Sequence, residues 1–98
     1  MLRIRWAKRA VQDFESALAY IAAEDPKNAA KVRGRIFATL KHLESFSLGL
    51  PAPRGAWKLY IPKTPYFIIF RRDDTATITI RAFVHAARDW EMIDWENL

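Results

Sequence analysis

The chain has 98 residues and no cysteine, so it forms one small domain that has neither a disulfide framework nor a thiolate metal site. All sixteen Lys and Arg lie within the first 88 residues, whereas four of the eleven Asp and Glu lie within the last ten. A basic body therefore carries an acidic tail, and such a body suits a polyanionic partner, either a nucleic acid or an acidic protein segment.

The first residues, MLRIRWAKRAVQDF, carry Arg and Lys where a secretory leader has an uncharged apolar core. No apolar run approaches the length that spans a bilayer. We therefore expect a cytoplasmic protein that contacts no membrane, and we expect neither a metal nor a cofactor.

A strand and two helices are predicted first. Residues 2–6, LRIRW, alternate apolar and basic side chains, which is typical of a short strand. Over 8–24 and again over 26–44, apolar residues recur three and four positions apart, which predicts two helices with one apolar stripe each. Asp25 fits the N-cap of the second helix and Pro26 its first turn, so the short connection predicts an antiparallel helical hairpin.

A loop and three strands are predicted next. Residues 45–55, SFSLGLPAPRG, have the Gly and Pro content of an irregular loop. Strand-like runs follow at 56–61, 66–72 and 75–85, and the turn sequences PKTP and DD separate them. The middle run is apolar on both faces, so we expect it to be the central, doubly covered strand of an antiparallel meander. This element order predicts an α+β fold of two layers, with the helical hairpin on one face of the sheet.

The last strand is expected to present one core face and one polar face, because side chains alternate with a period of two. The predicted core face consists of Ile78, Ile80, Ala82 and Val84, and the predicted polar face of Thr77, Thr79, Arg81, Phe83 and His85. Basic and aromatic residues that could approach the polar face from neighbouring strands are Arg54, Lys58, Tyr60 and Arg71. A bare surface of this kind could grip a phosphate backbone and stack a base.

Three stretches of the sequence resemble the RelE/ParE superfamily of bacterial toxins from type II toxin–antitoxin modules. They are IRWAKRAVQDFESALAYIA, GAWKLYIPKTPYFIIFRRDD and IRAFVHAARDW, which together span nearly the whole chain. The resemblance implies the order βααβββ, one toxin domain over 1–90 and an acidic amphipathic tail over 91–98. It also implies a growth-inhibiting, plasmid-stabilising toxin that forms a hetero-oligomer with a cognate antitoxin, whose acidic segment covers the basic sheet face and inactivates the toxin.

The superfamily includes two activities, since RelE-like members cleave mRNA in the ribosome and ParE-like members poison DNA gyrase. RNA cleavage without a metal needs an activated 2'-hydroxyl, cations at the phosphorane and a proton donor for the leaving oxygen. The first basic position of the RelE-like pattern corresponds to Lys58 in this chain. At the later basic positions of that pattern, this chain has Tyr60, Phe67 and Ala87 instead. Another mRNA-cleaving branch is matched by Arg71 and His85, with Glu44 as the nearest candidate for its carboxylate.

The ending FVHAAR is also common in ParE-like toxins without nuclease activity, so we favour a gyrase poison. The alternatives are a ribosome-dependent mRNA endonuclease and a non-toxic basic binding module. In the nuclease case the catalytic candidates are Arg71, Arg81 and His85. The candidates for binding the target or the antitoxin are Arg54, Lys58, Tyr60, Arg88, Lys31 and Arg35.

Several of these residues also have a structural interpretation. His85 could cap its strand through a backbone hydrogen bond, and Arg88 with Asp89 could form a salt bridge that fixes the exit of the chain. Trp90 is interpreted as a hydrophobic plug of the core. Lys31 and Arg35 are four positions apart, as on a solvated helix face.

Residues 91–98, EMIDWENL, place Met92, Ile93 and Trp95 among acids. Exposed apolar residues at a terminus need a surface to bury them. Three interpretations follow from the sequence: the tail packs on the sheet, it mediates a dimer, or it shields part of the basic face.

Overall fold

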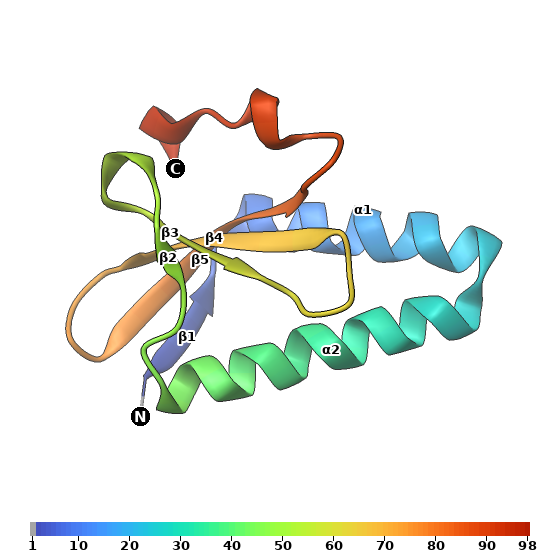
Figure 1. Ribbon diagram of the computed structural model, residues 1–98, viewed down its shortest axis with the longest axis horizontal. Coiled ribbons are helices and arrows are strands. Elements are labelled where there is room, and N and C mark those ends of the chain that lie inside the picture. The colour runs from blue at the N-terminus through green and yellow to red at the C-terminus, as the bar shows by residue number, and fades with distance from the viewer. Residues whose placement is uncertain (1) are drawn as a thin grey trace.

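The computed structural model describes residues 2–98 and has a helical hairpin on one face of a five-stranded sheet (Figure 1). The helices and strands are β1 (Arg3–Trp6), α1 (Lys8–Glu24), α2 (Pro26–Ser45), β2 (Leu50–Pro51), β3 (Trp57–Tyr60), β4 (Tyr66–Arg72) and β5 (Thr77–His85). Short 3-10 turns lie at Pro53–Gly55, Trp90–Met92 and Trp95–Asn97. The predicted α+β fold and its element order are confirmed.

The strand order in the sheet is β1-β5-β4-β3-β2, with β1 parallel to β5 and every other neighbour antiparallel. Strand β2 corrects the prediction of an irregular loop over 45–55. Leu50 pairs with Lys58 and Pro51 with Trp57, so β2 is a two-residue edge strand. Pro51 is compatible with this position because an edge strand can leave one side unpaired.

The residues that connect α1 to α2, Asp25 and Pro26, start the second helix of the hairpin. The Asp25 side chain accepts a hydrogen bond from the backbone N–H of Asn28 at 3.1 Å, and Pro26 occupies the first turn of α2. The predicted N-cap is therefore confirmed. The apolar stripes of α1 and α2 pack on the sheet, where Ala10, Val32, Ile36, Leu40 and Leu43 are buried against Ile68, Phe70, Ile78 and Ile80.

Strand β4 is buried on both faces. Tyr66, Ile68 and Phe70 belong to the core under the helices. Phe67 and Ile69 belong to a second cluster on the opposite face, with Ala56, Ala82 and Val84. The predicted doubly covered central strand is confirmed, and the second cover is the C-terminal segment, which packs on this face and lies above the sheet, away from α2, in Figure 1.

Strand β5 contains a β-bulge that reverses its alternation. Ile69 of β4 pairs with Ala82 and Phe70 pairs with Ile80, so Arg81 is an extra residue without a partner in β4. Beyond the bulge Phe83 lies in the core under the helices, and Ala82 and Val84 lie in the opposite cluster. The predicted faces of β5 are therefore right for Ile78 and Ile80 and wrong after Arg81.

Two glycines make a matched test of this packing. A Cβ added to Gly34, inside α2, would meet nothing within 4 Å, so Gly34→Ala should stabilise the protein by about 0.5–1 kcal/mol through helix propensity. At Gly49 the backbone φ is +107°, and a Cβ would lie 3.1 Å from Phe70 Cζ. Gly49→Ala should destabilise by about 1–3 kcal/mol.

Urea unfolding of both variants measures these changes as shifts of the midpoint in opposite directions. A loss of stability in Gly34→Ala would contradict the open surroundings of α2 at that position, and an unchanged midpoint in Gly49→Ala would contradict the close approach of the loop to β4.

Candidate functional site

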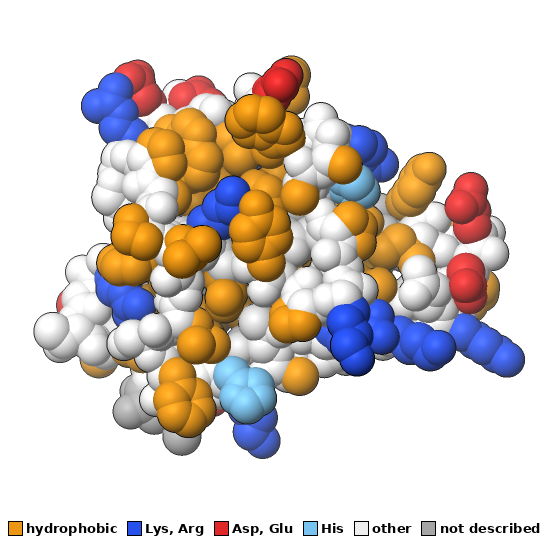
Figure 2. Space-filling model, in the orientation of Figure 1, with side chains coloured by type: hydrophobic (Ala, Val, Ile, Leu, Met, Phe, Trp, Pro, Cys, Tyr) orange, Lys and Arg blue, Asp and Glu red, His pale blue; other side chains and the backbone are white. Residues whose placement is uncertain are grey.

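The sheet face opposite the helices carries an apolar strip formed by Ala56, Phe67, Ile69, Ala82 and Val84, called here the tail strip. The tail, residues 91–98, packs on it through Ile93, Trp95 and Leu98. Figure 2 shows apolar side chains gathered over the sheet and beneath the C-terminal segment on this side, with isolated basic side chains among them. The tail therefore packs on the sheet, as the first of the three interpretations predicts.

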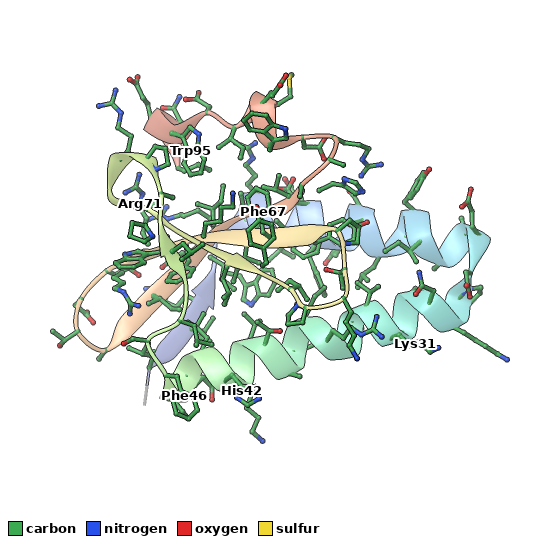
Figure 3. All side chains as sticks on the ribbon, in the orientation of Figure 1. Lys31, His42, Phe46, Phe67, Arg71 and Trp95 are labelled. Atoms are coloured by element: carbon green, nitrogen blue, oxygen red, sulfur yellow. The ribbon has the colours of Figure 1, made fainter. Side chains whose placement is uncertain are left out.

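Two arginines at the border of the tail strip hold the tail by polar contacts. The Arg54 guanidinium forms an ion pair with Glu96 at 2.5 Å. Arg71 donates from Nε to the backbone oxygen of Leu98 at 2.5 Å and from Nη1 to the backbone oxygen of Arg54 at 2.6 Å. Arg71 and Trp95 lie on the same side of the sheet as Phe67 in Figure 3. Arg71 therefore links the tail to the Pro53–Gly55 turn.

Lys58 and Tyr60 flank the tail strip on β3. The Lys58 ammonium lies 4.8 Å from the centre of the Tyr60 ring and 4.7 Å from that of Phe67. Both distances are within the range of a cation–π interaction. Tyr60 is 47% exposed, so this flank of the strip is not covered by the tail.

The expectation of a bare cationic face is wrong for the centre of the sheet, because the tail strip is apolar and occupied. A polar part remains at the other end of the same face. It is a shallow cavity of about 380 Å³ lined by Arg5, Thr77, Thr79 and Arg81, together with Asp73 and Asp74. Asp73 accepts a hydrogen bond from the Thr79 hydroxyl at 2.5 Å, so acids already offset part of the positive charge.

His85 lies on the helix side of the sheet. Its Nδ1 accepts hydrogen bonds from the backbone N–H groups of Ala87 and Arg88, both at 3.2 Å, and its ring contacts Tyr66 edge-on with 5.3 Å between centroids. It lines a cavity of about 300 Å³ with Ser16, Ala17 and Tyr20 of α1 and with Tyr66, Phe83, Arg88 and Asp89. The capping interpretation of His85 thus has a structural basis.

Burial in this cavity raises the pKa of the Tyr66 phenol above its usual value, and the nearby charge of Arg88 partly opposes that rise. The Tyr66 phenol is therefore neutral near pH 7, because its pKa lies above an ordinary value that is already about 10.

The structure does not assemble the nuclease candidates into one site. Arg81 faces the polar cavity beside β1, His85 faces α1 across the sheet, and Arg71 is bonded to the tail. The expectation that Arg81 and His85 share one face is therefore wrong, and the physical reason is the bulge at Arg81. Glu44, at the end of α2, lines cavities that His85 does not reach. Among residues 2–98, no cluster of three or more His, Asp or Glu could hold a metal ion.

Of the remaining candidates, Arg88 and Lys31 are exposed and Arg35 is half-buried. The Arg88 guanidinium lies 5.6 Å from the Tyr20 ring centre and 4.0 Å from the Asp89 carboxylate. Lys31 is exposed on α2, and Arg35 reaches the backbone oxygen of Lys63 at 3.4 Å. Trp90 is 56% exposed, which corrects its interpretation as a plug of the core. Trp95 fills that role instead.

Comparison with known proteins agrees with this fold. A family model described as the ParE toxin of the type II toxin–antitoxin system parDE matches residues 4–90. The chain belongs to this family. The curated protein named "Putative toxin Y4kP" of Sinorhizobium fredii is 32% identical over 95 residues, covering 93% of this chain and 95% of the relative. The chain is therefore a RelE/ParE superfamily toxin, as the sequence resemblance implied.

Solved structures match the ParE-family fold at low identity. A chain of the chromosomal ParDE system of P. aeruginosa aligns with a TM-score of 0.75 at 21% identity, over 87% of this chain and 96% of that one. A chain of the RelBE2 toxin–antitoxin complex of Mycobacterium tuberculosis aligns with a TM-score of 0.54 at 22% identity, over 86% and 96%. The family match stops at residue 90, directly before the tail. No helix within the part of the chain described has the length and apolarity to cross a membrane.

The two tryptophans of the C-terminal segment provide a test of tail packing. Trp95→Ala should lower the free energy of unfolding by about 1–3 kcal/mol, because tryptophan is the largest of the side chains that the tail packs on the sheet. Trp90→Ala, the matched control, should change it by less than about 0.5 kcal/mol because the side chain is exposed. Chemical denaturation measures both, and equal effects of the two substitutions would contradict the packing described.

The raised pKa of Tyr66 has a consequence for stability at alkaline pH. A group whose pKa is higher in the folded than in the unfolded protein stabilises the fold below its unfolded pKa, about 10 for tyrosine, and loses that contribution as the pH rises through the folded value. Wild-type protein should therefore lose stability more steeply above pH 10 than Tyr66→Phe. Urea titrations from pH 8 to 11 test this, and parallel curves would show that the phenol is not buried.

Proposed function

We propose that the chain is the growth-inhibiting toxin of a cytoplasmic type II toxin–antitoxin module and that it acts on DNA gyrase rather than as a ribonuclease. Family membership supports the toxin activity. The observation that favours the gyrase target is the separation of Arg81 and His85 onto opposite faces of the sheet.

Nuclease chemistry would need these residues around one phosphate. A general base, a general acid and the cations that offset phosphorane charge must all lie within hydrogen-bonding reach of the same reacting group. Here His85 accepts two backbone hydrogen bonds beside α1. Arg71 donates one hydrogen bond to the tail and one to the Pro53–Gly55 turn. His85 would have to cross the sheet to meet Arg71 and Arg81, which a packed core does not permit.

A basic row on α2 is the proposed contact surface for the target. The basic residues Lys27, Lys31 and Arg35 recur four positions apart. Lys63, in the β3–β4 turn, lies next to Arg35, because the Arg35 guanidinium donates a hydrogen bond to the Lys63 backbone oxygen. Figure 2 shows this row of basic side chains along the helical hairpin, and Figure 3 places Lys31 on it, away from the tail. Such a row attracts an acidic protein surface and speeds its association.

The proposed neutralising partner is a cognate antitoxin in a hetero-oligomer with this chain. The two solved structures compared above are described as toxin–antitoxin systems. The net charge of +5 favours an acidic antitoxin segment, with Arg54, Lys58, Tyr60 and Arg71 as its contacts on the sheet.

Induced expression in a bacterial host should arrest growth, and purified protein should inhibit gyrase supercoiling and accumulate cleaved DNA. His85→Ala and Arg81→Ala should retain toxicity within about twofold, because neither serves chemistry in this proposal. Reversing charge in the double variant Lys31→Glu, Arg35→Glu should weaken gyrase inhibition by at least about tenfold. Lys41→Glu, an exposed charge elsewhere on α2, is the matched control.

Three outcomes would contradict the proposal. Codon-positioned mRNA cleavage that disappears in His85→Ala would support the ribosome-dependent endonuclease instead. Normal growth during full expression would favour a non-toxic binding module. Gyrase inhibition unaffected by the double charge reversal would remove α2 as the contact surface.

A further inference from the structure

The cavity between α1 and the end of β5 contains a hydroxyl group that the fold leaves unpaired. Tyr66 is 4% exposed, yet its phenol oxygen has no hydrogen-bond partner among residues 2–98. Of the side-chain nitrogen and oxygen atoms in these residues that are sealed from solvent, Arg81 Nε is the one without a partner. The Tyr66 oxygen is therefore accessible, and it opens into the cavity of about 300 Å³ that Tyr66 lines. A ligand that pairs with this hydroxyl satisfies a group that burial otherwise penalises.

His85 and Arg88 add two donors to the same cavity. Nδ1 of His85 accepts two backbone hydrogen bonds at 3.2 Å, so the proton of the neutral ring is on Nε2, which can donate to a ligand. The Arg88 guanidinium lies 5.6 Å from the Tyr20 ring centre, and the Arg88 side chain is 52% exposed, so it stands at the mouth of the cavity. Tyr66, His85 and Arg88, called here the donor set, together match the acceptor oxygens of a carboxylate.

Two acids, Asp13 and Asp89, line the same cavity. Asp89 lies 4.0 Å from the Arg88 guanidinium, and Asp13 lies 3.9 Å from that of Arg9. A close hydrogen-bonded ion pair is shorter, about 2.7–2.9 Å, so both carboxylates keep acceptor positions for a ligand. The acids repel a simple anion and Arg88 repels a simple cation. The lining therefore suits a small molecule that carries both charges.

We propose that this cavity binds a free α-amino acid with an apolar side chain. The carboxylate of the ligand accepts hydrogen bonds from the donor set, its ammonium lies against the two acids, and its side chain packs on Ala17 and Phe83, the apolar part of the wall. A peptide terminus carries only one of the two charges and would leave the other half of the site unmatched. The volume is at the lower end of the range for small-molecule sites, about 300–1,000 Å³, which suits a single amino acid. This inference goes beyond the proposed function, because the cavity is separate from the basic row on α2.

A ligand in this cavity links α1 to the turn that follows β5. Asp13 belongs to α1, whereas Arg88 and Asp89 belong to that turn. An amino acid held between them binds the folded chain and not the unfolded one, so it stabilises the fold by mass action. The melting temperature should therefore rise with the concentration of the amino acid.

The test titrates the full chain with L-phenylalanine and with two analogues that each lack one charge. 3-Phenylpropanoate has no ammonium, and 2-phenylethylamine has no carboxylate. Nuclear magnetic resonance follows the backbone N–H signals of Ala87 and Arg88, which are bonded to His85 Nδ1. L-Phenylalanine should shift both signals saturably, with a Kd of about 1 mM or lower, and raise the Tm. Each analogue should bind at least about tenfold more weakly, because it loses the charge-assisted hydrogen bonds of the missing group.

Substitutions in the donor set test the position of the carboxylate. Arg88→Gln should weaken binding of L-phenylalanine at least about tenfold, and Tyr66→Phe should weaken it at least about threefold. Arg33→Gln is the matched control. Arg33 is exposed and lies 5.0 Å from the Phe37 ring centre, much as Arg88 lies over Tyr20, but it is outside the cavity. The control should bind L-phenylalanine as wild type does.

Asp89→Asn tests the ammonium contact. It should weaken binding of L-phenylalanine at least about threefold and should not weaken binding of 3-phenylpropanoate, which has no ammonium. An equal loss for both probes would show that Asp89 acts only through Arg88 and would contradict a zwitterionic ligand. Circular dichroism verifies that each variant is folded, and the exposed positions of Arg88 and Asp89 leave the core unchanged in those two variants.

Three results would overturn the proposal: no saturable shift with L-phenylalanine, an analogue that binds as tightly as L-phenylalanine, or Arg88→Gln with wild-type affinity. Tighter binding of 3-phenylpropanoate would assign the cavity to carboxylates without an ammonium instead. None of these measurements depends on growth arrest or on gyrase, so failure of the amino acid site is distinguishable from failure of the proposed function.

Discussion

A central strand that is apolar on both faces has to be covered twice, and the architecture of this protein follows from that constraint. Phe67, Ile68, Ile69 and Phe70 are at most 1% exposed, and they point alternately to the two sides of the sheet. Burial of each such side chain contributes about 1.5–3 kcal/mol relative to an exposed position. The helical hairpin covers one side. The tail covers the other side, so the sheet face that was expected to be bare is occupied.

The bulge in β5 decides how the remaining functional groups are distributed. One extra residue at Arg81 sends His85 toward α1 and leaves Arg81 facing the polar cavity beside β1. The chain thereby has the ParE-family fold with its basic and imidazole groups divided between two faces. A fold shared by toxins of different targets does not determine the chemistry, so the division of these groups is the more informative observation for function.

Much of the fold was predictable because its signals are local. The apolar stripes, the Asp25 cap with Pro26 and the turn sequences of the meander each act within a few residues, and each prediction is confirmed. The bulge was not predictable, because Ile80, Arg81 and Ala82 read as ordinary alternation and the extra residue is specified only by pairing with β4. Strand β2 was missed because two residues carry no periodicity.

The candidate site was predictable in part for the same reason. Arg54, Lys58, Tyr60 and Arg71 were expected to approach one face of the sheet from its neighbouring segments, and they do surround the tail strip. Which of Trp90 and Trp95 packs on the sheet depends on how the connection turns after β5, which the sequence does not encode locally.

The most direct test of this account is a nuclear Overhauser measurement on the Trp95 indole in the full chain. We expect contacts from the Trp95 ring protons to methyl groups of the tail strip, those of Ala56, Ile69, Ala82 or Val84, and no contacts from the Trp90 indole to these methyls. Random-coil chemical shifts for residues 91–98 and no contacts from Trp95 to those methyls would contradict it.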